Sequence, residues 1–154
     1  MIVISISEQC LRHRRRTGVW HNYPISTARN GAGNENGSFQ TPLGRHRICK
    51  KIGGGLPPLT AFVARTPVGM YHAESDTINR DWILTRILWL DGTQTGLNRR
   101  GRVDTRARYI YIHATHEEDK LGTPVSHGCI RMGNADVLEL FEHTQLGERV
   151  YIRP

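Results

Sequence analysis

Cysteine is scarce in this sequence, which limits the ways in which the fold can be stabilised. The 154 residues include three cysteines, Cys10, Cys49 and Cys129, an odd number at wide spacing. This pattern argues against a disulfide framework and indicates free thiols in a reducing compartment. A chain of about this length can still bury a core, because roughly 68–70% of the unfolded surface disappears on folding. We therefore expect a single domain over residues 1–154.

Long hydrophobic runs are also missing. No segment approaches the roughly 20 apolar residues that a membrane-spanning helix needs, so we expect no membrane span. Residues 1–8 lack a basic leader and an apolar run of about 7–15 residues, and they resemble a first strand more than a secretory signal. The sequence as given predicts a cytoplasmic protein. A periplasmic location is the alternative if a leader has been removed.

Acidic residues are outnumbered, with 14 Asp and Glu against 21 Lys and Arg, and the formal net charge is +7. An anionic partner is therefore expected, either a nucleic acid or a carboxylate-rich substrate. The arginine clusters at residues 12–16 and 99–102 lack interleaved aromatic residues and a helical recognition pattern, so nucleic-acid binding is the weaker alternative. The glycine-rich stretches 30–37 and 53–58 lack the spacing and the Gly-Lys-Ser/Thr sequence of phosphate loops, and we expect no cofactor. Oligomeric state is not predicted.

Short apolar runs rich in strand formers dominate the first two thirds of the chain. They predict a mainly β fold, a sandwich or a barrel-like sheet. One helix is expected near residues 135–146, with Asn134 as its N-cap and Gly147 just past its end. The expected strands include residues 2–6, 62–64, 82–84, 87–90, 109–112 and a closing strand at 149–152.

A histidine and cysteine constellation carries the chemical signal. Ser126-His127-Gly128-Cys129 forms a tight glycine turn, and His113 lies sixteen positions before the cysteine. A free cysteine has a pKa of about 8.5, and a nearby histidine is the usual means of generating a thiolate nucleophile at neutral pH. The glycine allows a tight bend that brings backbone N–H groups close to a developing oxyanion. These residues predict an acyl-transfer centre.

Two other interpretations of the same residues remain open. In the first, the cysteine is a small buried hydrophobe and the histidines are ordinary hydrogen-bonded side chains. In the second, His113, His116, His127 and Cys129 bind zinc, because nitrogen and sulfur ligands suit a tetrahedral site. The His-x-Cys spacing is unusual for zinc, so we expect no metal.

The sequence resembles the catalytic domain of the L,D-transpeptidases (YkuD type). The likeness rests on the Ile112-His113-Ala114-Thr115 segment, on the sixteen-residue spacing, and on the segment from Ser126 to Met132. Further similar segments cover most of residues 20–152, and the resemblance implies a mostly β, sandwich-like fold. These segments are Thr41-Pro42-Leu43-Gly44, Trp82-Ile83-Leu84-Thr85-Arg86, Arg108-Tyr109-Ile110-Tyr111-Ile112-His113 and Asn134-Ala135-Asp136-Val137.

The resemblance also implies catalytic roles. Cys129 is the expected nucleophile, and His113 is the base that activates it and then protonates the leaving amine. The backbone carbonyl of Ala114 is the expected orienting acceptor for His113. Family members often have glycine at this position, but alanine supplies the same carbonyl.

Substrate contacts follow from the same resemblance. Backbone N–H groups of His127, Gly128 and Cys129 are expected to form the oxyanion hole, and each good donor is worth about 2.7–4 kcal/mol of barrier. Arg131 is expected to bind a substrate carboxylate, for which its planar fork is suited, with Ser126 also on the substrate side. His116 is expected to be a loop histidine without such a role.

The implied substrate is a peptidoglycan stem tetrapeptide, on strands or as a muropeptide, cut between the L-centre of diaminopimelate and the terminal D-alanine. Water as acceptor gives an L,D-carboxypeptidase, whereas an amine of a second stem gives an L,D-transpeptidase that forms 3-3 cross-links. Because the sequence as given lacks a leader, we favour a cytoplasmic carboxypeptidase of murein recycling. A periplasmic transpeptidase is the runner-up. Carbapenems are expected to acylate Cys129.

Overall fold

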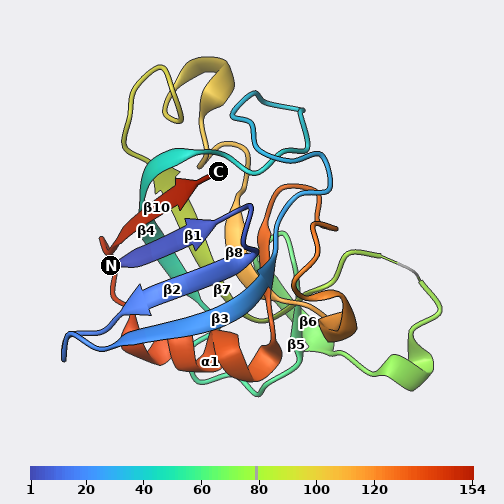
Figure 1. The fold of residues 1–154 in the computed structure, drawn as a ribbon. Helices are drawn as coiled ribbons and strands as arrows, with labels where there is room; N and C mark the ends of the chain where they lie inside the picture. The colour runs from blue at the N-terminus through green and yellow to red at the C-terminus, as the bar shows by residue number, and fades with distance from the viewer. Residues whose placement is uncertain (79) are drawn as a thin grey trace.

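Over residues 1–78 and 80–154, which the computed structural model describes, ten β-strands form one sheet and one α-helix packs against it (Figure 1). No helix in this part of the chain combines the length and apolar character needed to cross a bilayer. The strands are β1 (Ile2–Ser5), β2 (Cys10–Arg14), β3 (Trp20–Ser26), β4 (Gly44–Ile52), β5 (Thr60–Val63), β6 (Thr66–Met70), β7 (Ile83–Gly92), β8 (Tyr111–Ala114), β9 (Ile130–Met132) and β10 (Arg149–Arg153). The helix is α1 (Asn134–His143), and short 3₁₀ turns are η1 (Ala73–Ser75), η2 (Gly101–Val103) and η3 (Glu118–Lys120).

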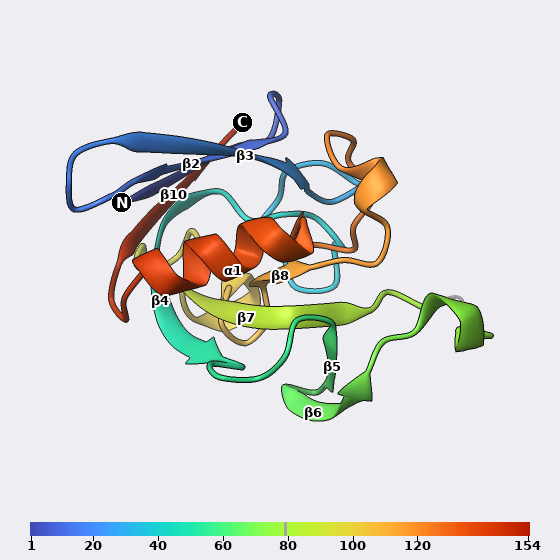
Figure 2. The same cartoon turned by 90° about the horizontal axis from the view of Figure 1, so that it is seen from below.

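The sheet closes on itself through β4, which pairs with both β10 and β7. The resulting strand order is β4-β10-β1-β2-β3-β9-β8-β7, with the β5–β6 hairpin continuing from β7. Most neighbours are antiparallel, but β1 with β10 and β8 with β9 are parallel. In Figure 2, α1 lies between β3 on one side and β7 on the other, and it packs against β7 and β8. The predicted mainly β, barrel-like fold with one helix is confirmed.

The core lies inside this closed sheet and under α1. Ile2 and Ile4 of β1 are fully buried, as their alternating positions predict. Strand β7 is buried along most of its length because it is covered by β4, β5 and β8 at its edges and by α1. Each fully buried aliphatic side chain contributes about 1.5–3 kcal/mol relative to exposure. The largest fully buried side chains are Ile2, Ile4, Leu11, Ile25, Ile48, Leu84, Ile87, Leu88, Leu90, Ile112, Ile130 and Met132.

Strand boundaries differ from the sequence prediction in several places. The strand expected at 109–112 spans Tyr111–Ala114, and the one expected at 62–64 spans Thr60–Val63. The apolar runs at 82–84 and 87–90 belong to one strand, β7, which has an irregular register between Leu84 and Ile87. Thr85 in that interval has φ of +70°, which bends the strand without ending it. Strands β2, β3, β4, β6 and β9 were not predicted. Charged or polar residues interrupt the apolar ones in β2 and β4, the exposed positions of β3 include Trp20 and Pro24, and β6 and β9 are only five and three residues long, so none of them forms a recognisable apolar run.

The helix begins and ends earlier than expected. Gly133 is its N-cap residue, and Asn134 is the first helical residue. The Asn134 amide N–H donates to the Glu118 carboxylate (2.5 Å), and its side chain donates to the Thr115 carbonyl (3.0 Å). The N-cap prediction for Asn134 is therefore wrong, because a carboxylate distant in sequence satisfies the helix start. Thr144 is extended and ends the helix three residues before Gly147.

Candidate active site

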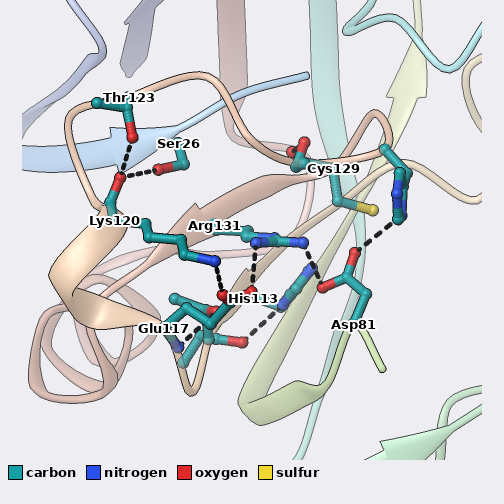
Figure 3. A network of polar contacts seen from close by, with 12 residues as sticks. Ser26, Asp81, His113, Glu117, Lys120, Thr123, Cys129 and Arg131 are labelled. Atoms are coloured by element: carbon teal, nitrogen blue, oxygen red, sulfur yellow. Dashed lines mark hydrogen bonds and ion pairs between the residues drawn. The ribbon is translucent and has the colours of Figure 1, made fainter. Parts of the chain in front are cut away.

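Parallel pairing of β8 and β9 brings the predicted residues together. His113 in β8 lies opposite Arg131 in β9, and Cys129 directly precedes β9. The loop between the two strands carries η3 and returns through the turn at residues 126–129. Figure 3 shows His113, Cys129 and Arg131 grouped around Asp81. Cys129 thus lies at the start of these two strands, and His113, sixteen positions earlier in sequence, lies a short way along the neighbouring strand.

His113 is buried, with 1% of its surface exposed. Its Nδ1 lies 2.7 Å from the Ala114 carbonyl oxygen, the contact that the sequence predicted. A carbonyl oxygen only accepts, so Nδ1 carries the hydrogen and Nε2 keeps its lone pair. Burial lowers the pKa of His113, although the Asp81 charge and the Ala114 carbonyl act in the opposite direction. The imidazole is therefore a neutral base at neutral pH.

The Cys129 thiol is held by backbone groups. Its Sγ accepts a hydrogen bond from the Tyr111 amide (3.3 Å) and lies 3.5 Å from the Tyr109 carbonyl, to which the thiol donates. Burial raises the pKa of Cys129 to about 12, and the negative charge of Asp81 adds to this effect. Thiol and imidazole are thus both uncharged at neutral pH. If this thiol attacks a carbonyl, its deprotonation has to accompany the attack.

The turn before the cysteine is fixed by the Ser126 hydroxyl. This hydroxyl donates to the Cys129 carbonyl (2.6 Å) and accepts from the Gly128 amide (3.2 Å). Gly128 has φ of +137°, and an added Cβ would lie 3.3 Å from Ile110 Cδ1 and 3.4 Å from the Gln40 carbonyl oxygen, so glycine is required there. The Gly128 N–H, predicted as an oxyanion donor, is therefore engaged within the turn. Ser126, predicted on the substrate side, shapes the same turn and is itself buried.

Arg108 reinforces the turn from outside. Its guanidinium donates to the carbonyl oxygens of Gly33 (3.2 Å) and Gln40 (2.6 Å). Next to Gln40, the Thr41 hydroxyl donates to the Gly128 carbonyl (2.9 Å). Arg108 thus fixes the glycine-rich loop that supports the cysteine turn. The sequence analysis missed this role, although Arg108 opens one of the segments that resemble the family.

Arg131 has partners that the sequence did not predict. It is 3% exposed, and its guanidinium lies 2.8 Å from the Asp81 carboxylate and 3.4 Å from the Glu117 carboxylate (Figure 3). Asp81 also lies 3.5 Å from His127 Nδ1. The guanidinium of Arg131, which was expected to bind a substrate carboxylate, is thus already paired with two carboxylates of the protein. Asp81 was missed because it directly precedes the family-like segment at 82–86 and carries no motif of its own.

His127 and His116, the other two histidines near the cysteine in sequence, lie at the margin of the site. The His127 side chain is 71% exposed, and its ring is edge-on to Phe39 at 6.2 Å between centroids. His116 packs against Tyr71, with ring centroids 5.4 Å apart, in a cluster separate from the cysteine. In residues 1–78 and 80–154, no group of three or more His, Cys, Asp or Glu side chains is arranged to hold a metal ion. A hollow of about 350 Å³ beside the turn is lined by Arg29, Asn30, Phe39, Ser126 and His127.

A known protein family matches nearly the whole chain. Residues 1–152 match the YkuD family, described as the L,D-transpeptidase catalytic domain. The chain belongs to this L,D-transpeptidase family. A curated relative, the putative L,D-transpeptidase YqjB of Bacillus subtilis (strain 168), is 46% identical over 48 residues, which cover 31% of this chain and 27% of that protein. The chain thus spans about a quarter of the curated L,D-transpeptidase that it matches.

Solved L,D-transpeptidase structures share the fold. The structure of LdtMt1 in complex with imipenem has a TM-score of 0.58 at 20% identity and covers 99% of this chain and 57% of that one. L,D-transpeptidase 3 from Mycobacterium tuberculosis, in complex with a faropenem-derived adduct, has a TM-score of 0.57 at 18% identity, with coverage of 99% and 59%. These L,D-transpeptidase structures extend beyond the region matched here.

Proposed function

We propose that this protein is a cysteine-dependent L,D-carboxypeptidase that acts on peptidoglycan stem tetrapeptides. The observation that carries the proposal is the placement of His113, oriented by the Ala114 carbonyl, on the strand next to Cys129. Family membership supports the substrate class. Cys129 is the proposed nucleophile and His113 the proposed base. The proposed oxyanion donors are the amides of His127 and Cys129, since the Gly128 amide is bound to Ser126.

The proposed reaction has two half-reactions that share His113. In the first, Sγ of Cys129 attacks the carbonyl at the L-centre of diaminopimelate while the thiol proton passes to His113 Nε2. The C–N bond to D-alanine then breaks, a thioester remains, and His113 gives its proton to the leaving amine. In the second, water attacks the thioester, its proton passes through His113 to the departing sulfur, and the tripeptide carboxylic acid is released. Because both residues start uncharged, no ion pair has to form before attack.

The charges around the thiol differ from side to side. Asp81 contributes negative charge near Cys129 and is paired with Arg131. Arg108, in contrast, contributes positive charge, and Arg65 lies over the ring of Tyr109, whose carbonyl accepts from the thiol. The competing acceptor is the side-chain amine of a second stem, which is an ammonium ion below a pKa of about 10.4. Arg65 and Arg108 repel such a cation on their side of the thiol, whereas water carries no charge, and this favours water as the acceptor. An L,D-transpeptidase forming 3-3 cross-links is the alternative that the test below distinguishes.

Mass spectrometry of disaccharide-tetrapeptide incubated with the purified protein tests both acceptors. We expect loss of one alanine without dimers. Dimers linked between two diaminopimelates would show that the protein is a transpeptidase and not a carboxypeptidase. Cys129→Ala should lower the rate by at least about a thousandfold. Cys49→Ala, which removes a half-buried thiol from β4, is the matched control and should keep the rate. An active Cys129→Ala variant would refute the nucleophile assignment.

Covalent labelling gives a second test of the nucleophile. A solved relative is bound to imipenem and another carries a faropenem-derived adduct. We expect imipenem to add one drug mass to Cys129, located by peptide mapping, and to add nothing to Cys129→Ala. An active enzyme without an adduct would contradict the proposed mechanism. The cytoplasmic location stays a prediction, which fractionation of cells that make the native protein tests.

A further inference from the structure

A guanidinium group at the tip of the β5–β6 hairpin, that of Arg65, contacts the side chains of Tyr109 and Tyr111, whose backbone groups contact the Cys129 thiol. Val63 pairs with Thr66, and the two residues between them, Ala64 and Arg65, have φ of +45° and +67°. Positive φ at both central residues is typical of a type I′ turn, which gives a tight hairpin end. The position of Arg65 is therefore set by a well-defined turn.

Aromatic residues hold the Arg65 side chain in place. Its Nη1 donates to the Tyr111 hydroxyl (3.0 Å), and its guanidinium carbon lies 4.8 Å from the Tyr109 ring centroid and 5.1 Å from that of Trp89. Trp89 and Tyr111 pack edge-on at 5.5 Å, which keeps this platform rigid. Cation–π contacts and one hydrogen bond orient the fork but use only one of its five N–H donors.

The same two tyrosines contact the thiol. The Tyr111 amide donates to Cys129 Sγ, and the Tyr109 carbonyl accepts from it. Arg65 is thus linked to the predicted nucleophile through side chains and backbone of the same residues. A ligand bound at Sγ therefore lies against the residues that hold this guanidinium.

Arg65 and Arg131 differ in whether an acidic side chain pairs with their guanidinium group. Arg131 is buried and paired with two carboxylates. Within the described residues, no Asp or Glu lies within ion-pair distance of Arg65, and the side chain is half-exposed. A planar fork with free donors matches the geometry of a carboxylate, which it binds through two parallel hydrogen bonds.

From these contacts we propose that Arg65 binds a carboxylate of the stem peptide and is a substrate-positioning residue of this site. The proposal rests on the proposed function and deepens it, because it moves the anionic anchor from Arg131 to the hairpin tip. The stem peptide carries carboxylates at its second, third and fourth residues, and one of them forms the pair with Arg65.

Calorimetric binding of free tetrapeptide to Cys129→Ala, which cannot turn the ligand over, tests the proposal. Adding Arg65→Met should weaken binding about ten- to a hundredfold, the loss typical of a hydrogen-bonded charge pair. Arg65→Lys should recover part of the loss. Arg149→Met, which removes an exposed arginine from β10, a strand that pairs with β1 and β4 and not with the hairpin, is the charge-matched control and should leave binding unchanged.

Peptides amidated singly at each carboxylate distinguish direct binding from a structural effect. Amidation of the carboxylate that Arg65 binds should weaken binding to Cys129→Ala. Adding Arg65→Met should then cause no further loss of affinity for that amidated peptide. If Arg65→Met weakens the binding of the free tetrapeptide and of every amidated peptide by the same factor, Arg65 only shapes the hairpin and the proposal is overturned. Unchanged binding by Arg65→Met overturns it as well. If Cys129→Ala binds no stem peptide at all, the proposed function fails first and this proposal fails with it.

Discussion

At the scale of single residues, the acidic group closest to the chemistry is Asp81. It pairs with Arg131 at 2.8 Å and lies 3.5 Å from His127 Nδ1. Its negative charge opposes thiolate formation at Cys129, whereas Arg131 and Arg108 favour it. Burial is the main reason that the pKa of the thiol is raised, and Asp81 adds to it by cancelling much of the positive charge that Arg131 would otherwise direct at the sulfur.

Replacing Asp81 with asparagine should make the thiol more reactive. Asp81→Asn keeps the size of the side chain but removes the charge, so the pKa of Cys129 should fall from its raised value of about 12. Each unit of decrease multiplies the thiolate population by about ten at a fixed pH well below the pKa. We expect the rate of alkylation by iodoacetamide at pH 8 to rise about three- to tenfold. Asp119→Asn, an exposed carboxylate of η3, is the control, and a rate that rises equally in both variants would contradict the role of Asp81.

The sequence predicted part of this site for a definite reason. His113 and Cys129 are connected by a local feature, a strand that leads into one loop, and their spacing alone suggested proximity. Asp81 reaches the same point from 48 positions before Cys129, through a contact that only the assembled sheet creates. No pattern in the neighbouring residues reports such a contact. Arg65 was missed for the same reason, because its partners Trp89 and Tyr111 lie on other strands.

At the scale of elements, α1 depends on a residue from β4. Lys51 Nζ donates to the carbonyl oxygens of Phe141 and Thr144, both at 2.6 Å, and lies 4.3 Å from the Phe141 ring centroid. These carbonyls belong to the last turn of the helix and its end, where backbone acceptors lack intrahelical donors. A cation at this position also interacts favourably with the helix dipole.

Removing this ammonium group should destabilise the helix end. Lys51→Met keeps much of the aliphatic stem but leaves two carbonyls without their donor, so we expect a loss of about 1–2 kcal/mol in the free energy of unfolding. Urea titration followed by circular dichroism measures it. Lys50→Met changes the neighbouring, exposed lysine of the same strand and should alter stability by less than about 0.5 kcal/mol. Equal losses in the two variants would show that Lys51 does not cap the helix.

The helix and the strands differ in how far the sequence predicted them. The apolar stripe of Val137, Leu140 and Phe141 has a helical period, and all three are buried as that period requires. The helix boundaries were less predictable, because Glu118 and Lys51 satisfy the two ends from distant positions. Strand β2, with the sequence Cys-Leu-Arg-His-Arg, buries only Leu11 and His13. Such a strand is defined by its neighbours more than by its own composition.

At the scale of the whole molecule, closure of the sheet joins segments from both ends of the sequence. β10 pairs with β1 and β4, and β2 pairs with β1. Glu148, directly before β10, lies 2.8 Å from His13 Nε2 of β2 and accepts from the Gln145 amide (3.2 Å). This carboxylate, with 11% of its side chain exposed, thus ties β2 to the turn that leads into β10.

Glu148 should therefore make the stability of the whole fold depend on pH. Burial raises its pKa, but hydrogen bonds, first of all from His13, outweigh burial and lower the pKa to about 2 from an ordinary value of 4.5. A carboxylate with a lowered pKa in the folded state stabilises the fold above its unfolded pKa. The contribution is lost as the pH falls from about 4.5 towards 2.

Glu148→Gln should separate this contribution from those of the other carboxylates. The variant keeps the shape of the side chain but has no charge to lose, so it should be less stable than the parent by about 2 kcal/mol at pH 7. The other carboxylates titrate in both proteins, so their effect cancels. The difference in the free energy of unfolding between the parent and Glu148→Gln should therefore shrink as the pH falls from about 4.5 to about 2. Urea unfolding at a series of pH values measures it, with the exposed Glu142→Gln as control. A difference that stays constant across this interval would show that Glu148 acts through packing alone, and that its charge does not help to hold the closed sheet together.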